Sequence, residues 1–180
     1  MRLAQKDPLA GFHEEVREAV IRATALVADQ PKERLVVIDP DSGDILFTNT
    51  GTTSHVGAGP GYRRAITVHN HPSGDAPFSR GDLALMVNND EVASIVVAAN
   101  RTYVLRPPKR GWAVEVRRRP DAARLLDPAG TTGQRSAPFR LCLAFVAATG
   151  ARYWDLPRSG RAGVRWIQAP GQGAQRVWPC

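Results

Sequence analysis

The sequence predicts a three-layer α/β domain in which a mixed β-sheet is flanked by helices. The first observation is a segment, residues 10–28, in which apolar residues recur at helical spacing. The second is a series of short apolar runs, rich in β-branched residues and separated by turn residues, which is typical of strands. The third is the length, since 180 residues are enough for one domain with a substantial core.

The predicted elements follow one another as helix, hairpin, strand, helix and strands. The apolar runs 35–38 and 45–47 are joined by a turn rich in Asp, Pro and Gly, and they predict a β-hairpin. A strand at residues 65–68 and a short helix at residues 80–89 come next. The remaining strands are expected at residues 94–99, 102–106 and 112–116.

The chain is organised around residues 66–83, which read ITVHNHPSGDAPFSRGDL. His69 and His71 lie at the C-terminal end of a predicted strand, and side chains two residues apart on a strand point to the same face. Pro72 ends the strand because it has no N–H to donate. Ser79 is expected to be the N-cap of the following helix, which carries Asp82 in its first turn.

The turn between this strand and this helix can bring Asp82 back to the two histidines. Two imidazoles and one carboxylate would then converge, with a fourth position open, as in catalytic zinc sites. His69, His71 and Asp82 are therefore the predicted ligands, and Zn²⁺ is the predicted ion. Each has a structural alternative, because an isolated histidine at a strand end is usually exposed or hydrogen-bonded, and Ser79 with Asp82 also fits a helix capping box.

Beyond residue 117 the periodic pattern ends. Residues 117–120 read RRRP, and the remainder of the chain is rich in Arg, Gly and Pro. We predict a domain at 1–117 and a tail at 118–180 that is largely disordered, allowing one short helix near residues 138–148. Two explanations of this end stay open: a segment that folds on a partner, and an out-of-frame translation product of GC-rich coding sequence.

The spacing His69-x-His71-Pro72, then Ser79 and Asp82, resembles the signature of the JAMM (MPN+) zinc metalloproteases. The wording HNHPSG is similar to the RadC-like bacterial branch of that superfamily, and residues 94–106 resemble the short bacterial and phage JAMM domains. The resemblance covers residues 30–107 and implies a cytidine-deaminase-like fold.

In that family the two histidines and the aspartate bind zinc, which assigns this role to His69, His71 and Asp82. The serine helps to stabilise the tetrahedral intermediate, which assigns that role to Ser79. The family also uses a glutamate general base at the start of an early strand, and Glu33 stands in that place. The next candidates for the base are on the first predicted helix: Glu14, Glu15 and Glu18.

The resemblance implies a zinc-dependent hydrolase that cleaves a peptide or isopeptide bond with a zinc-activated water and a glutamate base. The expected partner is a peptide or protein substrate. Two alternatives stay open. One is a RadC-like accessory protein associated with DNA, and the other is a catalytically silent interaction module of the same fold.

The charge distribution gives the DNA alternative its support. The net charge of +7 combines −4 over residues 1–100 with +11 over residues 101–180. A basic tail can contact phosphates, but this one lacks interleaved aromatic residues, so nucleic-acid binding is the minority expectation. We expect no membrane segment, since the apolar run at residues 141–148 is far below the ~20 residues needed. Cys142 and Cys180 form no framework, which favours a reducing cytoplasm.

Overall fold

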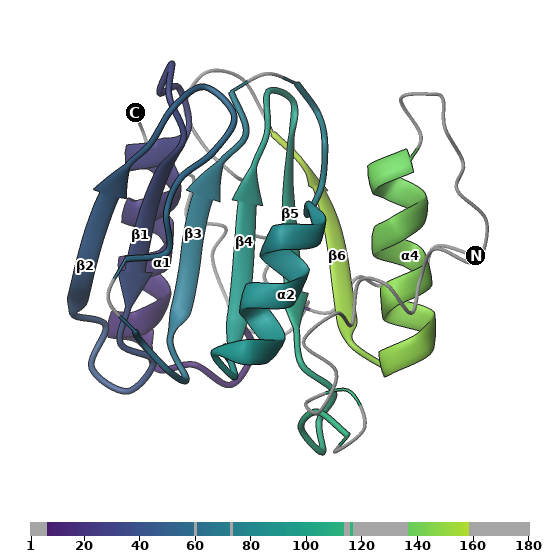
Figure 1. Ribbon diagram of the computed structural model, residues 1–180. Coiled ribbons are helices and arrows are strands. Elements are labelled where there is room, and N and C mark those ends of the chain that lie inside the picture. The colour runs from purple at the N-terminus through teal and green to yellow at the C-terminus, as the bar shows by residue number, and fades with distance from the viewer. Residues whose placement is uncertain (1–6, 60, 73, 114–115, 117–136, 159–180) are drawn as a thin grey trace.

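The computed structural model describes residues 7–59, 61–72, 74–113, 116 and 137–158 (Figure 1). Within these ranges the chain forms three helices and six strands, and all six strands belong to one mixed sheet in the order β2-β1-β3-β4-β5-β6. The elements are, in chain order, α1 (Glu14–Val27), β1 (Arg34–Ile38), β2 (Ile45–Thr50), β3 (Ile66–Asn70), α2 (Arg80–Asn88), β4 (Ala93–Val97), β5 (Arg101–Arg106), α4 (Ala137–Thr149) and β6 (Arg152–Pro157).

The centre of the sheet is the parallel pair β3 and β4. Parallel neighbours need a crossover connection, and α2 is part of it, lying in front of the sheet over β4 and β5 (Figure 1). The other neighbouring pairs are antiparallel. This topology places the C-terminal end of β3 next to the segment that leads into α2, which is where the histidine motif lies.

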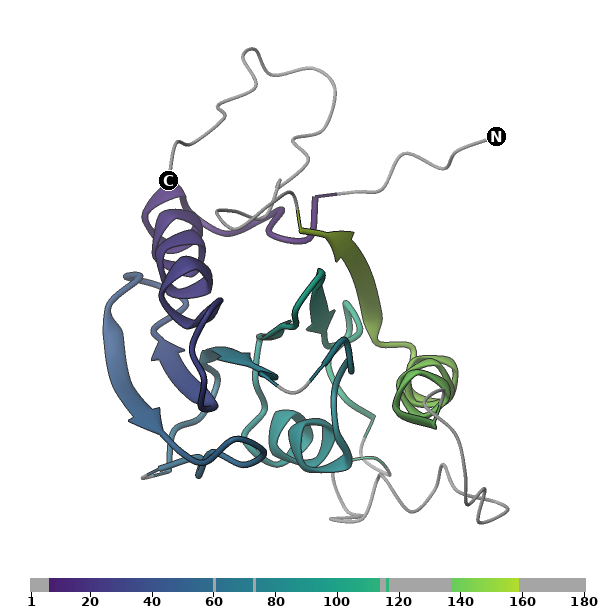
Figure 2. The ribbon, with the colours of Figure 1, turned by 90° about the horizontal axis from the view of Figure 1, so that it is seen from above.

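One face of the sheet is covered by α1 (Figure 2). Strand side chains alternate between the two faces, so every second strand residue packs toward this helix. The apolar core on this side contains Val16, Val20, Val27, Val36, Ile38, Ile66, Val68, Ile95, Val97 and Val104.

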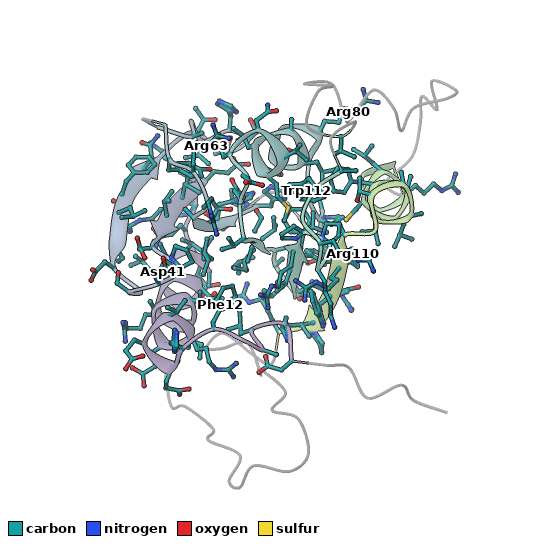
Figure 3. All side chains as sticks on the ribbon, turned by 90° about the horizontal axis from the view of Figure 1, so that it is seen from below. Phe12, Asp41, Arg63, Arg80, Arg110 and Trp112 are labelled. Carbon is teal, nitrogen blue, oxygen red and sulfur yellow. The ribbon has the colours of Figure 1, made fainter. Side chains whose placement is uncertain are left out.

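The opposite face is covered by α2 and α4 (Figures 1 and 2). Trp112 lies between these two helices, and its ring meets the edge of Phe145 with the centroids 5.7 Å apart (Figure 3). The apolar core on this side contains Phe78, Leu83, Met86, Val96, Leu105, Trp112, Cys142 and Phe145. Helices on both faces of a mixed sheet confirm the three-layer α/β architecture that the sequence predicts.

Most predicted elements up to residue 106 are confirmed with small shifts at their ends. The hairpin, the histidine strand, the helix after it and the two strands that follow all form. The strand predicted at 112–116 is not seen at Trp112 or Ala113, and residues 114 and 115 lie outside the described ranges.

The predicted domain boundary at residue 117 is wrong. Residues 137–149 form α4, close to the short helix expected near 138–148, but residues 152–157 form β6, which no pattern indicated. β6 pairs with β5 over six residues and completes the sheet. Residues 137–158 therefore belong to the domain, while residues 118–136 and 159–180 lie outside what the structure describes.

The helices are short compared with the thickness of a bilayer. α1 has 14 residues and α4 has 13, whereas a spanning helix needs about 20. In the described part of the chain, no helix is long and apolar enough to cross a membrane.

Candidate metal centre

The two histidines are delivered by β3 and by its continuation. His69 is the fourth residue of β3, and its side chain lies on the face covered by α2, since its neighbours Val68 and Asn70 point to the other face. The backbone N–H of His71 donates to the carbonyl of Val97 at 2.9 Å, which continues the ladder with β4 one residue beyond the strand. His71 therefore points to the same face as His69, as the sequence predicts.

Asp82 is delivered by the first turn of α2, and the cap of that helix fixes its direction. The carboxylate oxygen Oδ2 accepts a hydrogen bond from the N–H of Ser79 at 2.7 Å. In return the hydroxyl of Ser79 accepts one from the N–H of Asp82 at 3.2 Å, which completes a capping box. The capping box thus fixes the direction of the same carboxylate that the sequence proposes as a metal ligand.

The candidate donor atoms converge on one point. The Nε2 atoms of His69 and His71 are 3.3 Å apart. Asp82 Oδ1 lies 3.3 Å from His69 Nε2, and Asp82 Oδ2 lies 3.5 Å from His71 Nε2. Atoms bound tetrahedrally to one zinc at roughly 2.0–2.1 Å would be about 3.3–3.4 Å from one another. The spacing of the two nitrogens matches this value, and the Asp82 carboxylate lies at similar distances through its two oxygens, so the three residues could hold one ion between them.

The same contacts set the charges of the site. Burial opposes the charged form of Asp82, but the charges and hydrogen bonds of His69 and His71 outweigh it and hold the pKa of this carboxyl well below its usual range. Burial lowers the pKa of His71, whereas the hydrogen bond and charge of Asp82 raise it, so that the net pKa lies above the ordinary value. Asp82 is therefore a partly buried anion that a cation can stabilise.

Glu33 lies beside this cluster because of the pairing between β1 and β3. Leu35 pairs with His69, so the same antiparallel register places Glu33 opposite His71. Side chains of paired residues share a face of the sheet. Glu33 is buried, and its charge is among the causes that raise the pKa of His71, which puts its carboxylate within electrostatic reach of the site.

The backbone of Glu33 is held from the opposite side by the end of the hairpin. Its N–H donates to the carbonyl of Thr52 at 2.7 Å, and its carbonyl accepts from the N–H of Gly51 at 2.8 Å. Glu14, Glu15 and Glu18 belong to α1, which covers the other face of the sheet (Figure 2). These three residues are therefore not placed to act at the metal centre.

Asn70 is a residue of the site that sequence reasoning missed. Its side chain is buried on the face opposite to the histidines, where its Oδ1 accepts from the N–H of Arg34 at 2.7 Å. Its Nδ2 donates to the carbonyls of Gln30 and Lys32 at 3.0 and 3.2 Å. Asn70 thus fixes the segment that carries Glu33 against the strand that carries the histidines. The sequence offered one signal for this role: Asn70, whose side-chain amide can both donate and accept, stands between the two candidate ligands His69 and His71.

Comparison of the chain with protein-family models, with curated proteins and with solved structures found no match in any of the three. The interpretation of this centre therefore depends on its own residues, their spacing and their arrangement.

Proposed function

We propose that the protein is a zinc-dependent hydrolase of the JAMM type that cleaves a peptide or isopeptide bond. The observation that carries the proposal is the convergence of His69, His71 and Asp82, whose donor atoms lie within 4.8 Å of one another at the end of one strand and the start of one helix. Three protein ligands of this kind, with room for a fourth, are the donor set of catalytic zinc sites.

The proposed ion is held by His69 Nε2, His71 Nε2 and a carboxylate oxygen of Asp82. When bound, zinc supplies Lewis acidity, which lowers the pKa of a water toward about 7 and polarises a carbonyl. The partly buried negative charge of Asp82 and the two imidazoles suit a divalent cation of intermediate softness better than Mg²⁺ or Ca²⁺, which prefer oxygen donors alone.

Glu33 is the proposed general base. A carboxylate on the histidine face can accept a proton from the attacking water and return it to the nitrogen of the leaving amine, so that the amine departs neutral. The requirement is a carboxylate near the site that is not itself a ligand. Glu33 meets this requirement. It directly precedes β1, which carries none of the proposed ligands, and the register between β1 and β3 places it opposite His71.

Ser79 is the proposed donor to the oxygen that becomes negative during the reaction. Its hydroxyl oxygen accepts from the N–H of Asp82, which leaves the hydroxyl hydrogen free to donate to substrate. Ser79 is exposed, so a substrate carbonyl can reach it. A preorganised donor at this place stabilises the developing charge.

A library of peptides and lysine-linked isopeptides, incubated with the zinc-loaded protein, tests the proposal. Cleavage should stop when a chelator removes the metal, resume when zinc is returned, and be absent in Asp82→Asn. If the zinc-loaded protein cleaves no member, or if Asp82→Asn cleaves as the wild type does, the hydrolase proposal fails and a silent interaction module is favoured. Nucleic-acid binding by the basic end stays a separate prediction, and a salt-dependent DNA-binding assay tests it.

A further inference from the structure

A second polar cluster lies near the N-terminal ends of β3 and β4, between α2 and the sheet. Its central residue is Glu91, in the connection from α2 to β4, with a side chain that is almost completely buried. One carboxyl oxygen accepts from the hydroxyl of Tyr62 and the other from the hydroxyl of Thr67, each at 2.8 Å. The hydroxyl of Thr67 also lies 2.8 Å from that of Ser94.

The burial of the Glu91 carboxyl group needs an explanation, because its hydrogen-bond partners are neutral hydroxyls and not cations. Burial raises the pKa of Glu91, the hydrogen bonds from Thr67 and Tyr62 lower it, and the nearby charge of Asp82 raises it, so that the net pKa is about 7. Removing an acid from water costs several kcal/mol unless other interactions offset it. The bond to Tyr62 gives a structural role, since it ties the loop before β3 to the core. The carboxyl still has lone pairs that these two bonds leave unused.

Glu91 also lines a pocket that reaches the metal centre. The pocket is lined by Tyr62, Thr67, His69, Asp82, Glu91 and Ser94, together with apolar side chains. Its volume of about 20 Å³ decides what it can hold. A water needs about 10–15 Å³ on this measure and two to four polar partners, so the pocket suits one water and is too small for a substrate side chain.

The two histidines differ in what supports them. Nδ1 of His71 lies 3.0 Å from the carbonyl of Ala76, which fixes its ring. Nε2 of His69 faces His71 and Asp82. Among the residues that the structure describes, His69 Nδ1 has no protein hydrogen-bond partner. Histidine ligands of metals almost always donate their second ring N–H to a carboxylate, a carbonyl or a water.

We propose that Glu91 is a positioning residue of the metal centre, acting on His69 through one water held in this pocket. Thr67 and Ser94 hold the carboxyl and the water in place, and the water oxygen accepts a hydrogen bond from the Nδ1–H of His69. The ring of His69 is thereby fixed with Nε2 toward the metal. The proposal rests on the metal site of the proposed function, but it concerns binding of the ion and not turnover.

Zinc affinity measured with a competing chelator tests the proposal without a substrate. Glu91→Gln and Thr67→Val should each weaken zinc binding by about tenfold or more, within the 10–100-fold range found when such supporting partners of metal ligands are changed. Thr24→Val is the matched control, since Thr24 is also a buried threonine but lies on α1 with its hydroxyl bonded to the carbonyl of Val20. It should bind zinc as the wild type does.

Nitrogen NMR of the histidine rings provides a readout that a merely structural role would not change. In the zinc-loaded wild type, His69 should carry its proton on Nδ1 in a hydrogen bond, and this signal should shift in Glu91→Gln while that of His71 stays. Unchanged affinity and an unchanged His69 signal in both folded variants would overturn the positioning role. A wild type that binds no zinc would instead refute the metal site itself, so the two failures are distinguishable.

Discussion

At the scale of single residues, the site is held in place by protein contacts. His71 is fixed by the carbonyl of Ala76, Asp82 by the N–H of Ser79, and the Glu33 segment by Asn70. A site whose donors already point at one place loses little conformational entropy when the ion binds. Each of these contacts can be removed separately, so each role can be tested separately.

The proposed role of Glu33 as general base can be tested directly by substitution. Glu33→Gln keeps the size of the side chain but removes the proton acceptor, so zinc content should stay near wild type while turnover falls by roughly 10²–10⁴-fold. Zinc analysis and a cleavage assay on the same sample measure the two effects. Glu15→Gln, across the sheet on α1, is the control and should change neither. Wild-type turnover in zinc-loaded Glu33→Gln would assign the base elsewhere.

Glu91 should make the metal-free protein less stable as the pH rises. Its pKa is about 7 in the folded protein and 4.5 ordinarily, so between these values the folded state keeps a proton that the unfolded chain has released. Stability is therefore lost as the pH rises from 4.5 to 7, by about 3 kcal/mol from this group, and changes little outside that window.

Urea unfolding of the wild type and of Glu91→Gln at pH 4.5 and 7.5 measures this effect. The neighbouring Asp82, His69 and His71 are present in both proteins, so their contributions largely cancel in the comparison. The free energy of unfolding should fall more steeply with pH in the wild type than in Glu91→Gln. Equal slopes would mean that Glu91 is not buried as described.

At the scale of elements, the convergence of the candidate ligands was predictable because it is local. His69, His71, Ser79 and Asp82 come from one strand, one turn and one helix start, so spacing and capping rules determine how they meet. Glu33 depends on the pairing of β1 with β3, which no local pattern contains, and only the family resemblance indicated it. Asn70 and Glu91 are buried polar residues, and sequence alone does not tell which polar residues of a strand or turn become buried.

The capping box should contribute measurably to stability. Ser79→Ala removes the hydroxyl that accepts from the N–H of Asp82, and loss of such a cap typically costs about 0.5–2 kcal/mol. The N–H of Ser79 still holds Asp82, so zinc affinity should change little. Chemical denaturation compares this variant with Ser54→Ala, an exposed loop serine expected to stay within about 0.5 kcal/mol of wild type. Equal stability of the two variants would contradict a working cap.

At the scale of the whole molecule, the sequence predicted the three layers but not where the domain ends. β6 reads RYWDLP, which has neither strict alternation nor a continuous apolar run, and it is an edge strand with mostly half-buried side chains. Such a strand is specified by pairing with β5, about fifty residues earlier in the chain, and not by its own pattern. Basic and Pro-rich surroundings then favoured a disordered interpretation.

Phe145 tests whether α4 belongs to the core. It is fully buried against the α2 side of the sheet, whereas Leu143 on the same helix is 45% exposed. Phe145→Ala should therefore destabilise the protein by about 3–5 kcal/mol. Leu143→Ala should stay within about 0.5 kcal/mol of wild type. If thermal or urea unfolding shows no difference between the two variants, residues 137–158 do not pack as part of the domain.

Zinc stoichiometry of the purified full chain tests the metal centre most directly. Elemental analysis and calorimetric titration should give about one zinc per chain in the wild type and almost none when His69→Ala and His71→Ala are combined. The combination of His13→Ala and His55→Ala removes the same number of imidazoles outside the site and should retain the ion. A wild type without zinc, or a His69/His71 double variant that binds zinc as tightly as the wild type, would contradict a metal centre at His69, His71 and Asp82.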